Sequence, residues 1–204
     1  MDHPRQDPAE QARECMAAGL PVLPCHWPVP APGNGAGWTL PRCSCGRRDC
    51  PTLAAHPLDG LTVADATRSL LRMTAWWQRW PHANPAVPTD GLVDAVELRH
   101  PGPDGRILAW LDAQGVGAGP VVRLGVDRLV FLTARSAFAP SPAGEVRYAG
   151  DGRLVLLPPS RLVSGGRAVW ARSPGGPLPA PWPLFRALAN LPVAAELAAF
   201  GESA

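Results

Sequence analysis

The segment Arg42–Pro57 reads RCSCGRRDCPTLAAHP. Four side chains of this short segment are potential metal ligands: Cys43, Cys45, Cys50 and His56. Three thiols and one imidazole form the ligand set that a tetrahedral structural zinc ion prefers. Gly46 and Pro51 favour the turns that fold such a loop around an ion. The sequence therefore predicts a zinc-binding loop.

The charges around the loop agree with a zinc site, and the sequence leaves two alternatives open. Three thiolates around a zinc ion leave one net negative charge, which the neighbouring Arg42, Arg47 and Arg48 would offset. The alternative is that these are free or disulfide-linked cysteines in a proline-rich loop. Cys25 and His26 are also adjacent in the sequence, and either could replace His56 as the fourth ligand.

Length and composition predict one main folded domain. The chain has 204 residues, of which 46% are hydrophobic and eight are tryptophan, enough to bury a core. The net charge is only +2, so any nucleic-acid binding needs a local basic patch. Every basic residue is arginine. Neither a leader peptide nor a long apolar run is visible, and cysteine usage fits a reducing compartment, so a cytoplasmic location without a membrane segment is expected.

The pattern of apolar residues predicts alternating helices and short strands. Helices are expected at Pro8–Ala18, Asp65–Trp80, Arg106–Gln114, Leu184–Leu188 and Val193–Phe200. Strands are expected at Leu20–Leu23, Leu92–Leu98, Val121–Leu124, Arg128–Thr133, Val146–Tyr148, Arg153–Leu157 and Arg167–Trp170. We predict an α+β fold with a mixed central sheet flanked by helices. Residues 1–8 are expected to be a disordered terminus, 9–190 a domain that includes the zinc loop 42–57, and 191–204 a C-terminal helix or tail.

The predicted strand Leu92–Leu98 carries two acids. Asp94 alternates with apolar residues on one face, whereas Glu97 falls on the other face because residues three apart in a regular strand point in opposite directions. Only a bulge would bring the two carboxylates together. The plain alternative is a hydrogen-bonded acid at a sheet edge for Asp94 and a solvated surface charge for Glu97.

Several segments, in order, resemble the N-terminal domain of bifunctional DNA primase/polymerases, of the archaeo-eukaryotic primase superfamily and most like its actinobacterial branch. The matching segments are the first helix with GLPVLP, RCSCGRRDC with AHP, AWWQRWPHAN, VDAVEL, AGPV, LPPSRLVSGG with Trp170, and PLPAPW. They extend from about Ala9 to Trp182. The cysteine loop is the most distinctive of them.

The resemblance implies a nucleotidyltransferase core that polymerises DNA by two-metal phosphoryl transfer. It places Asp94 and Glu97 at the positions of the strand-borne ligands for Mg²⁺ or Mn²⁺, and it suggests Arg147 and Arg161 as contacts to substrate phosphate. It further implies partners in DNA replication: single-stranded or primer-template DNA, and a helicase supplied as a separate protein.

The chain departs from the family pattern at two functional positions. The nucleotide-contacting histidine of the family would fall at Val130, and its third metal-binding acid would fall at Arg147. The sequence therefore predicts a pseudoenzyme, a primase/polymerase-like domain that binds nucleic acid or replication partners without polymerising. The alternatives are an active template-dependent primase/polymerase and a zinc-stabilised protein-interaction module.

Overall fold

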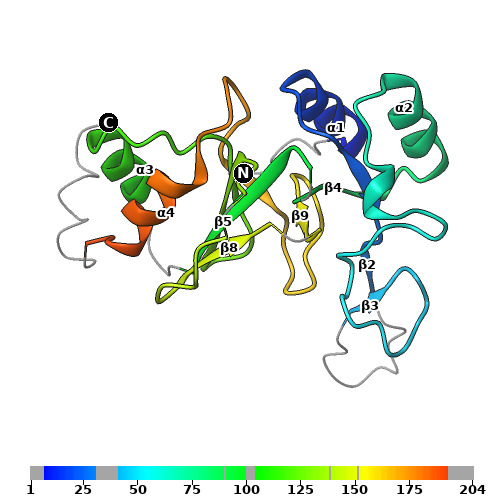
Figure 1. Cartoon of the computed structure of the whole chain (residues 1–204). Coiled ribbons are helices and arrows are strands. Elements are labelled where there is room, and N and C mark those ends of the chain that lie inside the picture. The colour runs from blue at the N-terminus through cyan, green and yellow to red at the C-terminus, as the bar shows by residue number, and fades with distance from the viewer. Residues whose placement is uncertain are drawn as a thin grey trace. The chain divides into compact units, whose positions relative to one another are not determined.

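The computed structural model of the chain describes residues 7–30, 41–89, 91–99, 104–137, 139–150 and 152–192. The chain divides into two compact units (Figure 1). Unit 1 comprises Met1–Pro88 and Leu154–Ala168, and unit 2 comprises Thr89–Arg153 and Val169–Ala204. The predicted domain 9–190 thus includes parts of both units. Within the described residues, no helix has the length and apolar character needed to cross a membrane.

Unit 1 is built on a three-stranded antiparallel sheet. Its strands follow the order β1 (Leu23–Cys25), β4 (Asn84–Pro88) and β9 (Leu154–Leu156). Helix α1 (Pro8–Ala17) begins at Asp7, whose carboxylate accepts a hydrogen bond from the Ala9 N–H as an N-cap. Helix α1 packs against α2 (Leu70–Arg79) and β4.

Helix α2 is shorter than the predicted helix Asp65–Trp80. Thr62 and Asp65 form a capping pair, but it caps only the short 3₁₀ turn η1 (Val63–Asp65). The chain then becomes extended, because Thr67 pairs with Val22 through two backbone hydrogen bonds of 2.9 Å.

A new N-cap, Ser69, therefore starts α2 at Leu70. Leu70 at its start is 52% exposed, whereas Met73, Trp76 and Trp77 form the buried face of the helix.

A two-stranded arm carries the cysteine loop. Strand β2 (Pro28–Val29) pairs antiparallel with β3 (Arg42–Cys43), so Cys43 lies opposite Pro28. In Figure 1 this arm lies apart from α1 and α2 within unit 1.

Unit 2 contains a five-stranded sheet in the order β10-β6-β7-β5-β8. The strands are β5 (Val93–Arg99), β6 (Val121–Arg123), β7 (Arg128–Ala134), β8 (Val146–Ala149) and β10 (Val169–Arg172). Helices α3 (Asp104–Ala113) and α4 (Pro181–Ala189) complete the unit. Because β5 pairs with β7 on one side and with β8 on the other, it is an interior strand.

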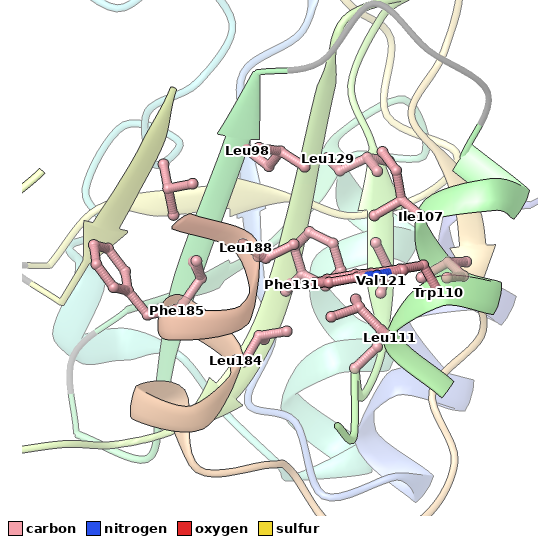
Figure 2. Close-up of a cluster of buried hydrophobic side chains, with 14 residues drawn as sticks. Leu98, Ile107, Trp110, Leu111, Val121, Leu129, Phe131, Leu184, Phe185 and Leu188 are labelled. Carbon is pink, nitrogen blue, oxygen red and sulfur yellow. The ribbon is translucent and has the colours of Figure 1, made fainter. Parts of the chain in front are cut away.

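The core of unit 2 forms where α3 and α4 cover one face of this sheet (Figure 2). Phe131 of β7 is fully buried between side chains of both helices, such as Leu111 of α3 and Leu184 of α4. Val96 and Leu98 of β5 belong to the same cluster. This cluster identifies the helix-covered face of the sheet.

The structure confirms the predicted α+β class. The described strand pairs are all antiparallel, whereas the sequence predicted a mixed sheet. The first strand lies at Leu23–Cys25 instead of Leu20–Leu23. The predicted helix Val193–Phe200 lies outside the described residues.

Candidate functional site

The four predicted metal ligands form one cluster in unit 1. The ligand atoms of Cys43, Cys45, Cys50 and His56 all lie within 4.8 Å of one another. Nε2 of His56 is 3.3 Å from Sγ of Cys43 and 3.4 Å from Sγ of Cys50. Ordinary zinc–sulfur and zinc–nitrogen bonds at tetrahedral angles place such atoms about 3.5 Å apart. The cluster therefore has the spacing of a site that can hold a metal ion such as zinc.

The hydrogen bond of His56 on its other ring nitrogen also suits coordination. Nδ1 lies 3.1 Å from the carbonyl oxygen of Pro57. Because a carbonyl only accepts, Nδ1 carries the proton, which leaves the Nε2 lone pair directed at the thiols. This arrangement fixes the tautomer that a metal ion requires.

Backbone groups around the cluster favour thiolates. Burial raises the pKa of Cys43 to about 11, although N–H groups of Cys45 and Ala54 oppose this by hydrogen bonding to its sulfur. Burial also raises the pKa of Cys45, but a hydrogen bond from the Arg47 backbone and those with the neighbouring thiols outweigh it, so this pKa lies below its ordinary value. A bound cation would displace the remaining thiol protons.

The two rival ligands, Cys25 and His26, lie outside the cluster. Cys25 is fully buried in β1, and burial strongly raises the pKa of its thiol. Nδ1 of His26 lies 2.8 Å from Oγ of Ser44, and its Nε2 lies 3.5 Å from Oδ1 of Asp59 without hydrogen-bond geometry. The ring centroids of His26 and His56 lie 4.4 Å apart, so His26 packs against the cluster.

In unit 2, the two acids of β5 point to opposite faces of the sheet. The register of β5 is continuous against both β7 and β8, with no bulge between Asp94 and Glu97. Asp94 therefore shares the helix-covered face with Val96 and Leu98, and Glu97 lies on the other face. The two carboxylates do not converge on one ion.

On that other face, three positions singled out from the sequence meet across adjacent strands. Glu97 lies directly opposite Val130 of β7 and directly opposite Arg147 of β8. Val130 is fully buried, Glu97 is half-buried and Arg147 is exposed. One acid, one apolar side chain and one guanidinium therefore occupy neighbouring positions.

Asp94 is buried and has hydrogen-bond partners within the protein. It is 2% exposed, and its Oδ2 accepts hydrogen bonds from the Ser136 N–H, at 2.8 Å, and from the Tyr148 hydroxyl. Gly150 leaves room for this contact, because a Cβ there would lie 2.8 Å from Cε1 of Tyr148. Asp94 thus links the end of β7 to β8.

Arg161, the other predicted phosphate contact, lies in unit 1, where it lines a cavity of about 410 Å³. Arg167 lines the same cavity and was not predicted. The Ser-Gly-Gly turn in RLVSGGR predicts that the chain reverses between Arg161 and Arg167, and this signal could have identified Arg167 as a neighbour of Arg161. Tyr148 was also missed, although it is the only tyrosine in the chain.

Comparison with known proteins gives one match. The family model of the bifunctional DNA primase/polymerase N-terminal domain, Prim-Pol, matches residues 12–193. Searches of curated proteins and of solved structures found no match. The family model covers most of the length of the chain, so the chain belongs to the Prim-Pol family.

The Asp94–Tyr148 contact leads to a testable prediction. Burial, followed by the hydrogen bond to Asp94 and the charge of that carboxylate, raises the pKa of Tyr148 well above its ordinary value. The neutral phenol therefore stabilises the fold below an unfolded-state pKa of about 10, and this stabilisation is lost as the pH rises through the folded-state pKa.

Tyrosinate absorbance should therefore show a midpoint well above pH 10 for the native protein and a midpoint of about 10 in denaturant. Asp94→Asn should lower the native midpoint part of the way, because it removes the carboxylate charge but leaves the ring partly buried. A native midpoint at the ordinary value would contradict the buried contact.

Proposed function

We propose that this protein is a Prim-Pol domain that binds nucleic acid in a replication setting and does not polymerise it. The observation that carries the proposal is the meeting of Glu97, Val130 and Arg147 on one face of the sheet of unit 2. These are the positions at which the family resemblance places a metal ligand, the nucleotide-contacting histidine and a second metal ligand.

Two-metal phosphoryl transfer depends on carboxylates that converge on a pair of cations. Here the only carboxylate among those three positions is Glu97. The guanidinium of Arg147, directly opposite Glu97 in the register, repels a divalent cation at that point. Asp94, on the opposite face, has its carboxylate oxygen Oδ2 occupied by Ser136 and Tyr148.

The charge distribution supports binding of nucleic acid by unit 1. Arginines outnumber acidic residues in unit 1, whereas acidic residues outnumber arginines in unit 2. Arginine is well suited to phosphate, because its planar guanidinium donates two parallel hydrogen bonds to the oxygens. We therefore expect contacts to the nucleic-acid backbone, which position a strand without reading its sequence.

We also propose that the cysteine cluster holds one structural zinc ion. All four ligands come from the protein, so no coordination position is open to substrate. The ion would tie β3, through Cys43, to the loop that ends at His56. Since binding free energy of a structural zinc ion contributes directly to folding, the ion would stabilise the arm formed by β2 and β3.

Metal analysis of the purified protein should therefore find about one zinc ion per chain. Cys45→Ser and His56→Ala should both lose the ion and lower the thermal midpoint, because three ligands bind zinc much more weakly than four. Cys25→Ala is the matched control and should retain zinc. Zinc that survives His56→Ala but is lost on changing Cys25 or His26 would show that the fourth ligand is misassigned.

Primer extension tests the proposed loss of activity. The wild-type protein, assayed with Mg²⁺ and with Mn²⁺ beside Asp94→Ala, should give no extension above a no-enzyme blank. Extension by the wild type that Asp94→Ala abolishes would overturn the proposal and restore the active primase/polymerase.

Binding of a labelled single-stranded oligonucleotide, followed by fluorescence anisotropy, tests the other half of the proposal. The logarithm of the binding constant should fall linearly with the logarithm of salt concentration, with a slope of about −0.7 for each phosphate neutralised. Absence of both extension and oligonucleotide binding would favour the protein-interaction module instead.

A further inference from the structure

The three sulfurs of the cysteine cluster differ in their access to solvent. Cys43 is 2% exposed, whereas Cys45 and Cys50 are half-buried, and none of the three forms a disulfide. A small cavity of about 210 Å³ lies beside the cluster, and its lining residues are Arg47, Cys50, Pro51, Thr52 and His56. Small solutes therefore have access to Cys45 and Cys50 but not to Cys43.

The size of this cavity limits what can enter it. At about 210 Å³ it is smaller than the usual small-molecule site, which occupies about 300–1,000 Å³. Hydrogen peroxide is only slightly larger than a water molecule, whose share of liquid volume is about 30 Å³. The cavity therefore has room for a small oxidant beside the sulfur of Cys50.

The loop between the two accessible cysteines can bring their sulfurs together. Residues 46–49, which separate Cys45 from Cys50, are all exposed. The ligand atoms of the cluster already lie within 4.8 Å of one another, and a disulfide bond requires about 2.05 Å between two sulfurs. An exposed loop can make this movement without disturbing the core of unit 1.

Cys43, in contrast, is held in place. It belongs to β3 and lies opposite Pro28 of β2. The N–H of the next residue, Ser44, donates to the carbonyl of Trp27 at 2.9 Å, and the Trp27 N–H donates to Oγ of Ser44 at 3.1 Å. Because only this fixed residue separates Cys43 from Cys45, a disulfide between those two would be strained.

We infer that Cys45 and Cys50 form an oxidation site, which a hydroperoxide converts to a disulfide with release of the ion held by the cluster. The release of an ion rests on the proposed zinc site, whereas the pairing of the two cysteines rests on their exposure and spacing. Coordination keeps cysteine ligands deprotonated, and the thiolate is the form that reacts with an oxidant.

The reaction balances in two steps. One thiolate attacks a peroxide oxygen, so that an S–O bond forms, the O–O bond breaks and hydroxide leaves. The second thiolate attacks the sulfur of the resulting sulfenic acid, so that the S–S bond forms and a second hydroxide leaves. The two sulfurs lose two electrons, the peroxide gains them, and two protons from solvent convert the hydroxides to water.

Oxidation would change both the cluster and the arm that carries it. Cys43 and His56 would remain as the only ligands, and two ligands bind zinc much more weakly than four. The arm formed by β2 and β3 would then lose the stabilisation that the ion supplies. A reductant that cleaves the disulfide restores all four ligands, so the modification is reversible.

The test uses the full chain loaded with zinc, and hydrogen peroxide as the oxidant. A chromogenic chelator follows the released zinc, and mass spectrometry after alkylation of the remaining thiols locates the disulfide. Trypsin cleaves between Cys45 and Cys50, so their disulfide links the peptides 43–47 and 49–68. Because the first peptide also contains Cys43, its fragmentation identifies which of its two cysteines is bonded.

Peroxide should produce the Cys45–Cys50 disulfide and release about one zinc ion for each disulfide formed. Cys15 and Cys25 are fully buried, so they should stay reduced and serve as internal controls. Dithiothreitol with added zinc should restore the bound ion. A disulfide that includes Cys43, or no disulfide under conditions that oxidise free glutathione, overturns the inference.

The variant Cys50→His removes the pair but leaves two cysteines and two histidines, a ligand set that also binds structural zinc. Its peroxide-dependent release of zinc should be at least about tenfold slower than in the wild type. Cys25→Ala is the matched control and should release zinc as the wild type does. Release from Cys50→His at the wild-type rate overturns the inference. If Cys50→His does not hold zinc, the disulfide mapped in the wild type decides.

Failure of this inference and failure of the proposed zinc site give different results. If the purified chain neither holds nor takes up zinc, the proposed ion is refuted. The metal-free chain then decides the inference, because a Cys45–Cys50 disulfide supports it and the absence of that bond overturns it. If the chain holds zinc and peroxide does not form the bond, the proposed ion stands and the inference fails.

Discussion

Strand β5 is hydrogen-bonded along both edges, and this constraint determines the chemistry of unit 2. The pairing with β7 extends from Val93 to Arg99 without a break, and the pairing with β8 keeps the same alternation. A strand held on both sides cannot bulge at low cost, so its two acids must point to opposite faces. Asp94 then joins the helix-covered face, and Glu97 is left beside Arg147.

Charged side chains have different surroundings in the two units. In unit 2, the carboxylate of Asp94 is buried and accepts hydrogen bonds from two donors of the protein, so Asp94 has a structural role. In unit 1, Arg161 and Arg167 are placed opposite each other at a cavity. The backbone of Arg161 is held by two hydrogen bonds to the buried side chain of Asn84.

Much of this fold follows from sequence patterns, and the exceptions have physical reasons. The alternation around Asp94 and the spacing of the cysteines predicted the faces of β5 and the metal cluster, because both depend on local geometry. The predicted start of α2 at Asp65 was wrong, because the bridge between Thr67 and Val22 is a long-range contact that separates the 3₁₀ turn at Val63–Asp65 from the helix. For the same reason, the role of Tyr148 was not predicted, because its partner Asp94 lies 54 residues away in the sequence.

Calorimetric titration with Mn²⁺ decides whether β5 can support a pair of divalent cations, on which the proposed loss of polymerisation depends. Protein first saturated with zinc should show no further saturable site in the wild type. Arg147→Asp should gain one, because it replaces the repelling guanidinium with a carboxylate directly opposite Glu97. Saturable Mn²⁺ binding by the wild type that is lost in Glu97→Gln would show instead that β5 holds a catalytic cation.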